Sequence, residues 1–312
     1  METEKRPLII LTGPTAVGKT ELSIELAKSI GGEIVSADSM QVYRGMDIGT
    51  AKIKKEQMQG VTHHLIDIIN PDEEFNVSIF KELAVKAIDE IYSRGNIPIM
   101  TGGTGFYIQS VLYDVQFEET DKDDSYRREL KDFADKNGAA ALHARLNEID
   151  SHSAAAIHPN NIKRVIRAIE YFHQTGKPIS EHNEKARAGK PAYRFKYFVL
   201  SLPREILYPR IDKRVDIMRE EGLEREVLTL REKGYGNGLV SMQGLGYKEL
   251  LAAFDGKYSI DTAFEKIKQG TRHFAKRQFT WFGRERDVTW VEKSSYKNND
   301  SILDYIIGET QK

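Results

Sequence analysis

Residues 13–20 read Gly-Pro-Thr-Ala-Val-Gly-Lys-Thr, a complete phosphate-binding loop of the form G-x-x-x-x-G-K-T. In such a loop the backbone N–H groups point at an anionic diphosphate, and the dipole of the following helix adds to the attraction. We expect Lys19 to supply a mobile positive charge and the hydroxyl of Thr20 to be placed to ligate Mg²⁺. The residues expected to bind the phosphorylated ligand are Gly13, Pro14, Thr15, Ala16, Val17, Gly18, Lys19 and Thr20.

Asp38 is the acidic residue best placed to act beside this loop, because it directly follows the apolar segment 33–37. A carboxylate there can accept a proton from a weak nucleophile, or it can organise a metal ion as in P-loop kinases. The aspartate that closes a later strand in many nucleotide hydrolases is missing, since the segment 97–100 runs into Thr101-Gly102-Gly103. The sequence also lacks the Asn-Lys-x-Asp motif of GTPases. The loop and Asp38 leave the phosphate chemistry open.

The elements that position these groups come from the first hundred residues, in which strand and helix patterns alternate. This order predicts an α/β fold of the P-loop NTPase type, a parallel sheet with helices on both faces. Ligands collect at the carboxyl ends of parallel strands, so the loop, Asp38 and the turn 101–105 should meet at one edge of the sheet. The expected strands are 8–11, 33–37 and 97–100, and the expected helices are 22–27 and 77–92.

The pattern becomes helical after about residue 120, where strand signals are lacking and alanine is common. We interpret 121–190 as a helical insertion domain within an α/β catalytic core formed by 1–120 and 191–312. In the second part of the core, strands are expected at 195–200 and 288–291 and helices at 204–233 and 258–282.

The composition of the 312 residues is that of an ordinary globular protein, with 40% hydrophobic and 30% charged residues. No stretch approaches the length of a membrane span, and no secretory signal opens the chain. The absence of cysteine excludes disulfides and thiolate metal sites and is compatible with a reducing compartment. We expect a cytoplasmic monomer without a membrane partner.

Charge is unevenly spread, although the net charge is only −1. Acidic residues crowd 118–124, and basic residues crowd 187–214, where two acids accompany eight Lys and Arg. Such a basic segment can follow a phosphate backbone, but it can equally be a solvated face. The basic residues are Arg187, Lys190, Arg194, Lys196, Arg204, Arg210, Lys213 and Arg214.

Six blocks spread over nearly the whole chain belong together: 13–20, 38–52, 63–65, 102–104, 157–160 and 275–281. In combination they resemble the tRNA dimethylallyltransferase family. The most specific is 38–52, Asp-Ser-Met-Gln-Val-Tyr-Arg-Gly-Met-Asp-Ile-Gly-Thr-Ala-Lys. The resemblance implies transfer of a dimethylallyl group from its diphosphate to the exocyclic amine of the adenosine at tRNA position 37, next to the anticodon, with release of diphosphate. The other blocks are 13–20, His63-His64-Leu65, Gly102-Gly103-Thr104, Ile157-His158-Pro159-Asn160 and Ala275-Lys276-Arg277-Gln278-Phe279-Thr280-Trp281.

The resemblance also implies catalytic roles for residues of this chain. The adenine amine is a poor nucleophile, and Asp38 resembles the family's general base. The developing charge on diphosphate must be neutralised, which Thr15, Lys19, Arg214 and Mg²⁺ at Thr20 would do. As alternatives, Asp38 organises a metal ion and Arg214 is a solvated helix residue.

The tRNA anticodon stem-loop is the partner that the resemblance implies, with the 121–190 insertion gripping the anticodon arm. The target base must be extruded from its stack to be modified, and the segment 38–41 resembles the part that contacts the flipped base. Basic residues on one helical face suit the RNA backbone, although turn chemistry at Thr104 and a solvated basic face are alternatives. The expected tRNA-binding residues are Asp38, Ser39, Met40, Gln41, Thr104, Arg127, Lys163, Arg164 and Arg167. Segments 244–248 and 276–277 resemble further family blocks.

His63 and His64 could suggest a metal site, but adjacent residues do not share a helix face and no third ligand has a useful spacing. We interpret them as hydrogen-bonded histidines at a pocket. Three other functions fit parts of the sequence: a small-molecule P-loop kinase, a prenyltransferase of free adenine nucleotides, and a non-catalytic RNA-binding module. The first two leave the insertion unused, and the intact Lys19, Thr20 and Asp38 disfavour the third.

Overall fold

The computed structural model describes residues 5–117 and 124–311, which form two compact units. One unit combines Met1–Leu112 with Ala192–Lys312, and the other is Tyr113–Pro191. The expected boundary between residues 120 and 121 lies outside the described residues, as does most of the acidic run 118–124. Each unit is described by itself below.

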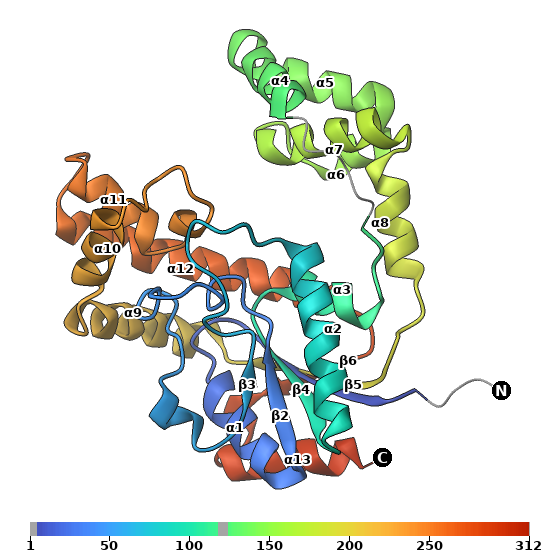
Figure 1. Cartoon of the computed structure of the whole chain (residues 1–312), viewed down its shortest axis with the longest axis vertical. Helices are drawn as coiled ribbons and strands as arrows, with labels where there is room; N and C mark the ends of the chain where they lie inside the picture. The colour runs from blue at the N-terminus through green and yellow to red at the C-terminus, as the bar shows by residue number, and fades with distance from the viewer. Residues whose placement is uncertain (1–4, 118–123, 312) are drawn as a thin grey trace. The chain divides into compact units, whose positions relative to one another are not determined.

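The first unit is built on a sheet (Figure 1). Its six strands lie in the order β3-β2-β4-β1-β5-β6. Every neighbouring pair of strands is parallel, so the expected parallel α/β sheet is confirmed. β1 lies inside the sheet, where Ile10 stands opposite Met100 on one side and Tyr197 on the other. The strands are β1 (Pro7–Thr12), β2 (Gly32–Ser36), β3 (His63–His64), β4 (Ile97–Gly102), β5 (Arg194–Ser201) and β6 (Val288–Glu292).

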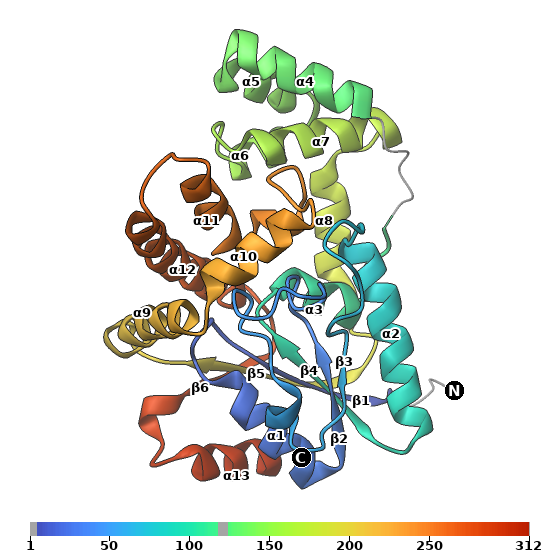
Figure 2. The ribbon, with the colours of Figure 1, turned by 60° about the vertical axis from the view of Figure 1, so that its left-hand side comes forward.

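Helices cover both faces of this sheet (Figure 2). Ile9 and Leu11 of β1 pack with Leu22 of α1 and Ile306 of α13. Because side chains alternate along a strand, the equally buried Ile10 points to the opposite face, where α2 packs on β2 and β4 and also contacts α3. The helices of this unit are α1 (Lys19–Ile30), α2 (Val77–Ser93), α3 (Gly105–Leu112), α9 (Arg204–Glu220), α10 (Leu223–Glu232), α11 (Tyr247–Phe254), α12 (Ile260–Phe282) and α13 (Asn299–Thr310), with short 3-10 turns at Lys55–Met58, Ser241–Gln243 and Lys293–Ser295.

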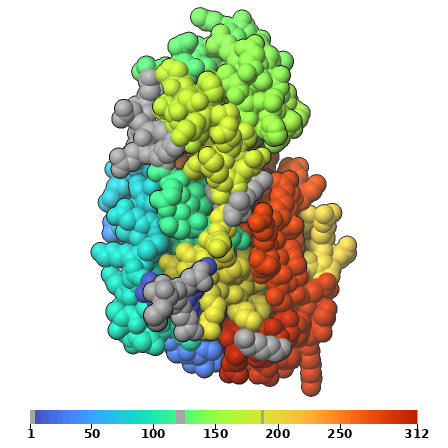
Figure 3. Space-filling model, turned by 90° about the vertical axis from the view of Figure 1, so that its right-hand side faces the viewer, coloured from blue at the N-terminus to red at the C-terminus, as the bar shows by residue number. Residues whose placement is uncertain are grey.

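The helical region expected at 204–233 is two helices, because the chain turns at Gly222 with a left-handed φ of 97°. A side chain with a Cβ disfavours that conformation, so α9 ends there and α10 begins. The structure adds four elements that we did not expect, namely β3, α3, α11 and α13. Residues from both sequence segments of this unit, blue to green and yellow to red, are visible on the face in Figure 3.

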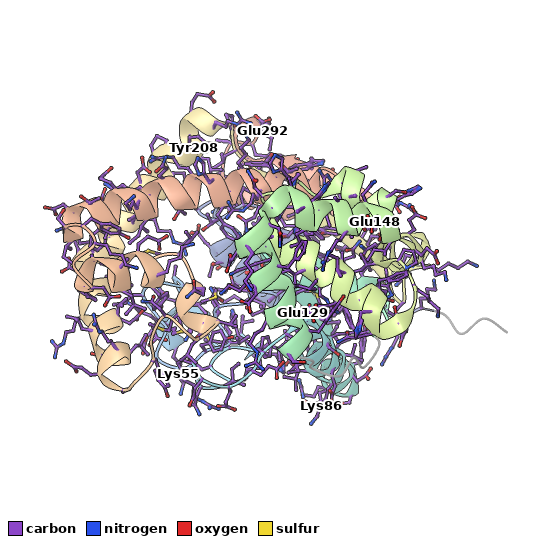
Figure 4. The ribbon with its side chains drawn as sticks, turned by 90° about the horizontal axis from the view of Figure 1, so that it is seen from above. Lys55, Lys86, Glu129, Glu148, Tyr208 and Glu292 are labelled. Atoms are coloured by element: carbon purple, nitrogen blue, oxygen red, sulfur yellow. The ribbon has the colours of Figure 1, made fainter. Side chains whose placement is uncertain are left out.

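The second unit is entirely helical in the residues described, as expected for the insertion. Its core joins Leu130, Leu142, Leu146, Val165 and Ile169 from three helices. Figure 4 labels Glu129 and Glu148, which are exposed, so the surface of this unit carries acids as well as bases. No helix in the described part of the chain is long and apolar enough to cross a membrane. The helices are α4 (Asp124–Asn137), α5 (Ala139–Ile149), α6 (Ser151–Ala156), α7 (Ile162–Thr175) and α8 (Ile179–Ala188).

Candidate active site

The phosphate-binding loop connects the carboxyl end of β1 to the first turn of α1, as predicted. Gly13 has a φ of 146°, and a Cβ there would lie 2.4 Å from the carbonyl oxygen of Leu200, so only glycine fits. Gly18 also has a positive φ, 94°, immediately before the helix begins. The Nζ of Lys19 donates to the carbonyl oxygens of Gly13 and Pro14, at 2.8 and 2.9 Å. The lysine therefore closes the loop on itself while it remains at the cavity wall.

A cavity of about 560 Å³ opens beside this loop within the first unit. Thr15, Lys19 and Thr20 line it together with Asp38 and Arg214, so the expected catalytic residues converge. Ala16 and Gly18 also line it, whereas Val17 is fully buried. The remaining polar and charged lining residues are Ser23, Ser36, Gln41, Thr50, His63, Thr101, Arg210, Lys213 and Gln278.

Electrostatics in this cavity favour an anion. Burial and the neighbouring Arg214 guanidinium lower the pKa of Lys19 to about 7, although the Asp38 carboxylate acts in the opposite direction. Burial likewise lowers the pKa of Arg214. The guanidinium of Arg214 donates to the hydroxyl of Thr15 at 3.4 Å, and Arg210 donates to the carbonyl oxygen of Ala16 at 3.0 Å. A bound diphosphate would relieve the repulsion between these cations.

Asp38 lies two residues after the end of β2 and is held by its own turn. Its Oδ1 accepts hydrogen bonds from the backbone N–H groups of Met40 and Gln41, at 2.9 and 3.4 Å. Oδ2 has no hydrogen-bond partner among the residues that the structure describes, and the carboxylate lines the cavity. One oxygen thus fixes the side chain while the other is available to a ligand.

The glycine-rich turn at the end of β4 contacts the residues on either side of Asp38. Gly102 approaches Ala37 so closely that a Cβ would lie 2.2 Å from its carbonyl oxygen. The backbone N–H of Thr104 donates to the same carbonyl at 3.1 Å, and the Thr104 hydroxyl accepts from the N–H of Ser39 at 3.2 Å. Thr104 therefore anchors both neighbours of Asp38, a structural contact that the sequence did not indicate.

A second cavity of about 320 Å³ shares Thr15, Asp38, Arg214 and Phe274 with the first. Ser39, Met40 and Thr104, three of the expected tRNA-binding residues, line this second cavity, whereas Gln41 lines the first. Lys248 and Arg277, from the two segments 244–248 and 276–277, lie among its lining residues. Asp38 thus lines both cavities.

The segment 47–49 is held by Glu226 of α10, which sequence reasoning did not identify. One carboxylate oxygen accepts from the N–H groups of Asp47 and Ile48, at 3.0 and 2.7 Å. The other accepts from Gly49 N–H at 3.1 Å and from the Tyr247 hydroxyl at 2.6 Å. Nothing in the sequence distinguishes this glutamate from other helix acids.

Lys52, the last residue of the block 38–52, is also held by structural contacts. Its side chain is 4% exposed, and its Nζ donates to Tyr43 O at 2.7 Å and to Asp47 and Asp67, at 2.6 and 2.5 Å. Gln41 makes longer bonds, from Nε2 to the carbonyl oxygens of Thr50 and Ala51, at 3.4 and 3.5 Å. Lys52 and Gln41 therefore have structural contacts within the segment 38–67.

Four of the expected tRNA-binding residues belong to the second unit. Arg127 donates from Nε and Nη2 to both carboxylate oxygens of the buried Glu170, at 2.7 and 2.8 Å. Lys163, Arg164 and Arg167 are exposed on α7. Arg127 is thus part of an ion pair, whereas the α7 cluster is open to solvent. The side chain of Arg187 lies outside the described residues.

The adjacent histidines are hydrogen-bonded. Nδ1 of His63 donates to the carbonyl oxygen of Val61 at 2.9 Å, and burial lowers the pKa of His63. His64 contacts Glu33 at 2.7 Å, where Arg94 also binds. Within residues 5–117 and 124–311, no group of three His, Asp or Glu side chains could hold a metal ion. The histidines are hydrogen-bonded, as expected, and His63 lines the first cavity.

The IPP transferase family model matches residues 41–285. The chain belongs to this family. A tRNA dimethylallyltransferase of Lachnoclostridium phytofermentans is 61% identical over 298 residues, which are 96% of this chain and 95% of the relative.

Solved structures of the IPP transferase family are similar as well. The tRNA Δ(2)-isopentenylpyrophosphate transferase of Staphylococcus epidermidis is 46% identical, with a TM-score of 0.73, and the match covers 98% of this chain and 99% of that one. A eukaryotic dimethylallyltransferase acting on tRNA is 29% identical, with a TM-score of 0.80 over 97% of this chain and 79% of that one.

Proposed function

We propose that this protein transfers a dimethylallyl group from dimethylallyl diphosphate to the exocyclic amine of an adenosine in tRNA, next to the anticodon, and releases diphosphate. The observation that carries the proposal is the position of Asp38, which lines a cationic cavity and a second cavity at once. The donor occupies the first cavity and the extruded adenine the second, so the two substrates meet at Asp38. The relatives named above act on tRNA, which supports this acceptor.

The residues at this junction suit the following reaction. The amine nitrogen attacks C1 of the dimethylallyl group, the C1–O bond breaks, and its electron pair leaves with the diphosphate. Oδ2 of Asp38 accepts the proton that the amine loses, which makes a poor nucleophile reactive. Lys19, Arg214 and the loop N–H groups stabilise the negative charge on the leaving oxygen.

Mg²⁺ fits the donor site, because this ion takes one or two protein oxygens together with phosphate oxygens and water. Thr20 lines the cavity beside Lys19, and its hydroxyl is the group that would hold the ion. When bound, Mg²⁺ supplies additional charge neutralisation on diphosphate. No acid cluster is required for this arrangement.

The acceptor site suits a single base and its backbone. Phe274 offers an aromatic face at the junction, and stacking on such a face binds unpaired bases. Lys248 and Arg277 carry positive charge for the adjoining phosphates. The exposed cluster Lys163, Arg164 and Arg167 of the insertion is proposed to contact the anticodon arm. With tRNA as substrate, we also propose a cytoplasmic location.

The decisive test is product analysis. The protein is incubated with Mg²⁺, dimethylallyl diphosphate and unmodified tRNA, which is then digested to nucleosides. We expect isopentenyl-adenosine in tRNA that has adenosine next to the anticodon and none when guanosine replaces it. Parallel reactions contain AMP in place of tRNA, or ATP in place of the donor. Product from AMP alone, or ATP consumption without prenylation, would contradict the proposal.

A further inference from the structure

The block 275–281 at the carboxyl end of α12 resembles the family, but the reaction above gives no role to its most buried polar residue. Gln278 is 5% exposed and lies between two segments far away in the sequence. Its Oε1 accepts from the backbone N–H of Thr15 at 2.9 Å, and its Nε2 donates to the carbonyl oxygen of Gly103 at 3.0 Å. One side chain therefore joins the phosphate-binding loop to the turn after β4.

The chemistry of the two partners fixes the orientation of this amide. A backbone N–H only donates and a carbonyl oxygen only accepts, so Oε1 must face Thr15 and Nε2 must face Gly103. The approach also requires glycine at 103, because a Cβ there would lie 2.2 Å from Nε2. A carboxylate or a hydrocarbon of the same size could not make both bonds.

Each end of this bridge reaches a residue that the reaction uses. On one side, the hydroxyl of Thr15 accepts from Arg214 at 3.4 Å. On the other side, Gly103 precedes Thr104, whose N–H and hydroxyl hold the two neighbours of Asp38. The positions of the leaving diphosphate and of the base are thus coupled through one amide.

The bridge also determines which loop groups bind the ligand. The N–H of Thr15 is used inside the protein and is not available to the diphosphate. The N–H of Val17 is also used, by the carbonyl oxygen of Pro14 at 3.4 Å. The loop therefore has its other N–H groups for the donor, and Thr15 lines both cavities.

We infer that Gln278 is a positioning residue, which sets the distance between the leaving group in the phosphate-binding loop and the proton acceptor Asp38. In a displacement, the amine, C1 and the leaving oxygen must be held in line, and an error of about 1 Å costs about 100-fold in rate. This inference rests on the proposed function. It predicts a loss in kcat rather than in substrate binding.

The test uses two isosteric variants, Gln278→Met and Gln278→Glu, in the full-length protein with tRNA and dimethylallyl diphosphate. Q278M cannot form either bond, and we expect kcat to fall about 100-fold while both KM values stay within about threefold. Q278E keeps the acceptor for Thr15 N–H but has no donor for Gly103 O unless its carboxyl is protonated. The activity of Q278E relative to wild type should therefore rise as the pH is lowered, whereas that of Q278M should not.

Gln269 provides the matched control, because it is exposed on the same helix, α12. Q269M and Q269E should match wild type in kcat, and thermal melting should show that all variants are folded at the assay temperature. A kcat of folded Q278M within threefold of wild type would overturn the inference, as would parallel pH profiles of Q278E and Q278M. Failure of the wild-type protein to prenylate tRNA would instead contradict the proposed function.

Discussion

Lys19, Arg210, Lys213 and Arg214 all line the first cavity, and Asp38 is the one carboxylate among its described lining residues. Positive charge is thus held together in a partly buried space without an equal number of acids. Such an arrangement is costly without a ligand and becomes favourable when an anion binds. Burial and the neighbouring charge of Arg214 therefore explain the lowered pKa of Lys19, and the group of cations explains the affinity expected for a diphosphate.

Donor binding should be linked to proton uptake at Lys19. With a pKa of about 7 in the free protein, this lysine is mostly neutral at pH 8, whereas diphosphate favours its charged form. We expect titration calorimetry at pH 8, in buffers of different ionisation enthalpy, to detect uptake of about one proton per donor bound. Affinity should weaken as the pH rises above 7. K19M should take up no proton, and equal uptake by both proteins would rule out this assignment.

Asp38→Asn separates proton acceptance from the structural role of the same side chain. Asparagine keeps an Oδ1 that can accept from Met40 and Gln41, so the turn should persist. Loss of the base should lower kcat by about 10²–10⁴-fold, while the Kd for tRNA measured by filter binding changes little. Comparable losses in kcat and tRNA affinity would make Asp38 a binding residue.

At the scale of elements, the substrate-facing segments are loops that distant helices hold in place. α10 holds the segment 47–49 through Glu226, and α12 holds the phosphate-binding loop through Gln278. Residues 49–51 line one or both cavities, so the position of this segment shapes both substrate sites.

Glu226→Gln tests the support that α10 provides. The amide replaces one acceptor oxygen with an NH₂ group that faces N–H or O–H donors, so at least one donor loses its partner. We expect the free energy of unfolding in urea to fall by about 1–3 kcal/mol and the KM values for both substrates to rise. Glu232→Gln, at an exposed position of α10, is the control. Unchanged stability and KM would mean that the segment 47–49 does not depend on Glu226.

At the scale of the whole molecule, the insertion carries its own core and its own exposed bases. The exposed Arg127 is paired with the buried Glu170, whereas the side chains of Lys163, Arg164 and Arg167 make no hydrogen bonds to described protein groups. The ion pair thus contributes to the unit itself, whereas the three exposed bases, of which Arg167 also lies over the Tyr171 ring, are the residues proposed to contact RNA.

The triple variant K163E/R164E/R167E should weaken tRNA binding without changing donor binding. Each phosphate that the variant no longer neutralises should reduce the slope of log K against log salt by about 0.7–0.9. Filter binding across a salt series measures this slope. R127A serves as a comparison, because it should lower the free energy of unfolding while its salt slope stays close to that of wild type. A salt slope equal to that of wild type would exclude the α7 cluster from the RNA interface.

Local sequence patterns predicted much of the fold, because β1 is an unbroken apolar run and α1, α2 and α12 carry apolar residues at helical spacing. They did not predict α3, whose first residue, Gly105, ends a glycine-rich run that also reads as a turn. The same patterns predicted the loop and Asp38 at one site, since parallel strands end at a common edge. Glu226 could not be predicted, because its role depends on a contact made across the fold.

The pairing of β1 with both β4 and β5 also has a consequence for synthesis of the chain. The first 112 residues contain β4, but β5 is made only after the whole of the insertion has been translated. At ~5–20 residues per second, that interval is roughly ten seconds. During this interval, the apolar strand Leu8-Ile9-Ile10-Leu11 has no partner on the side where β5 will pair. An unpaired strand edge is a surface through which nascent chains aggregate. The need for chaperone protection should therefore be greatest while the ribosome is still translating the insertion.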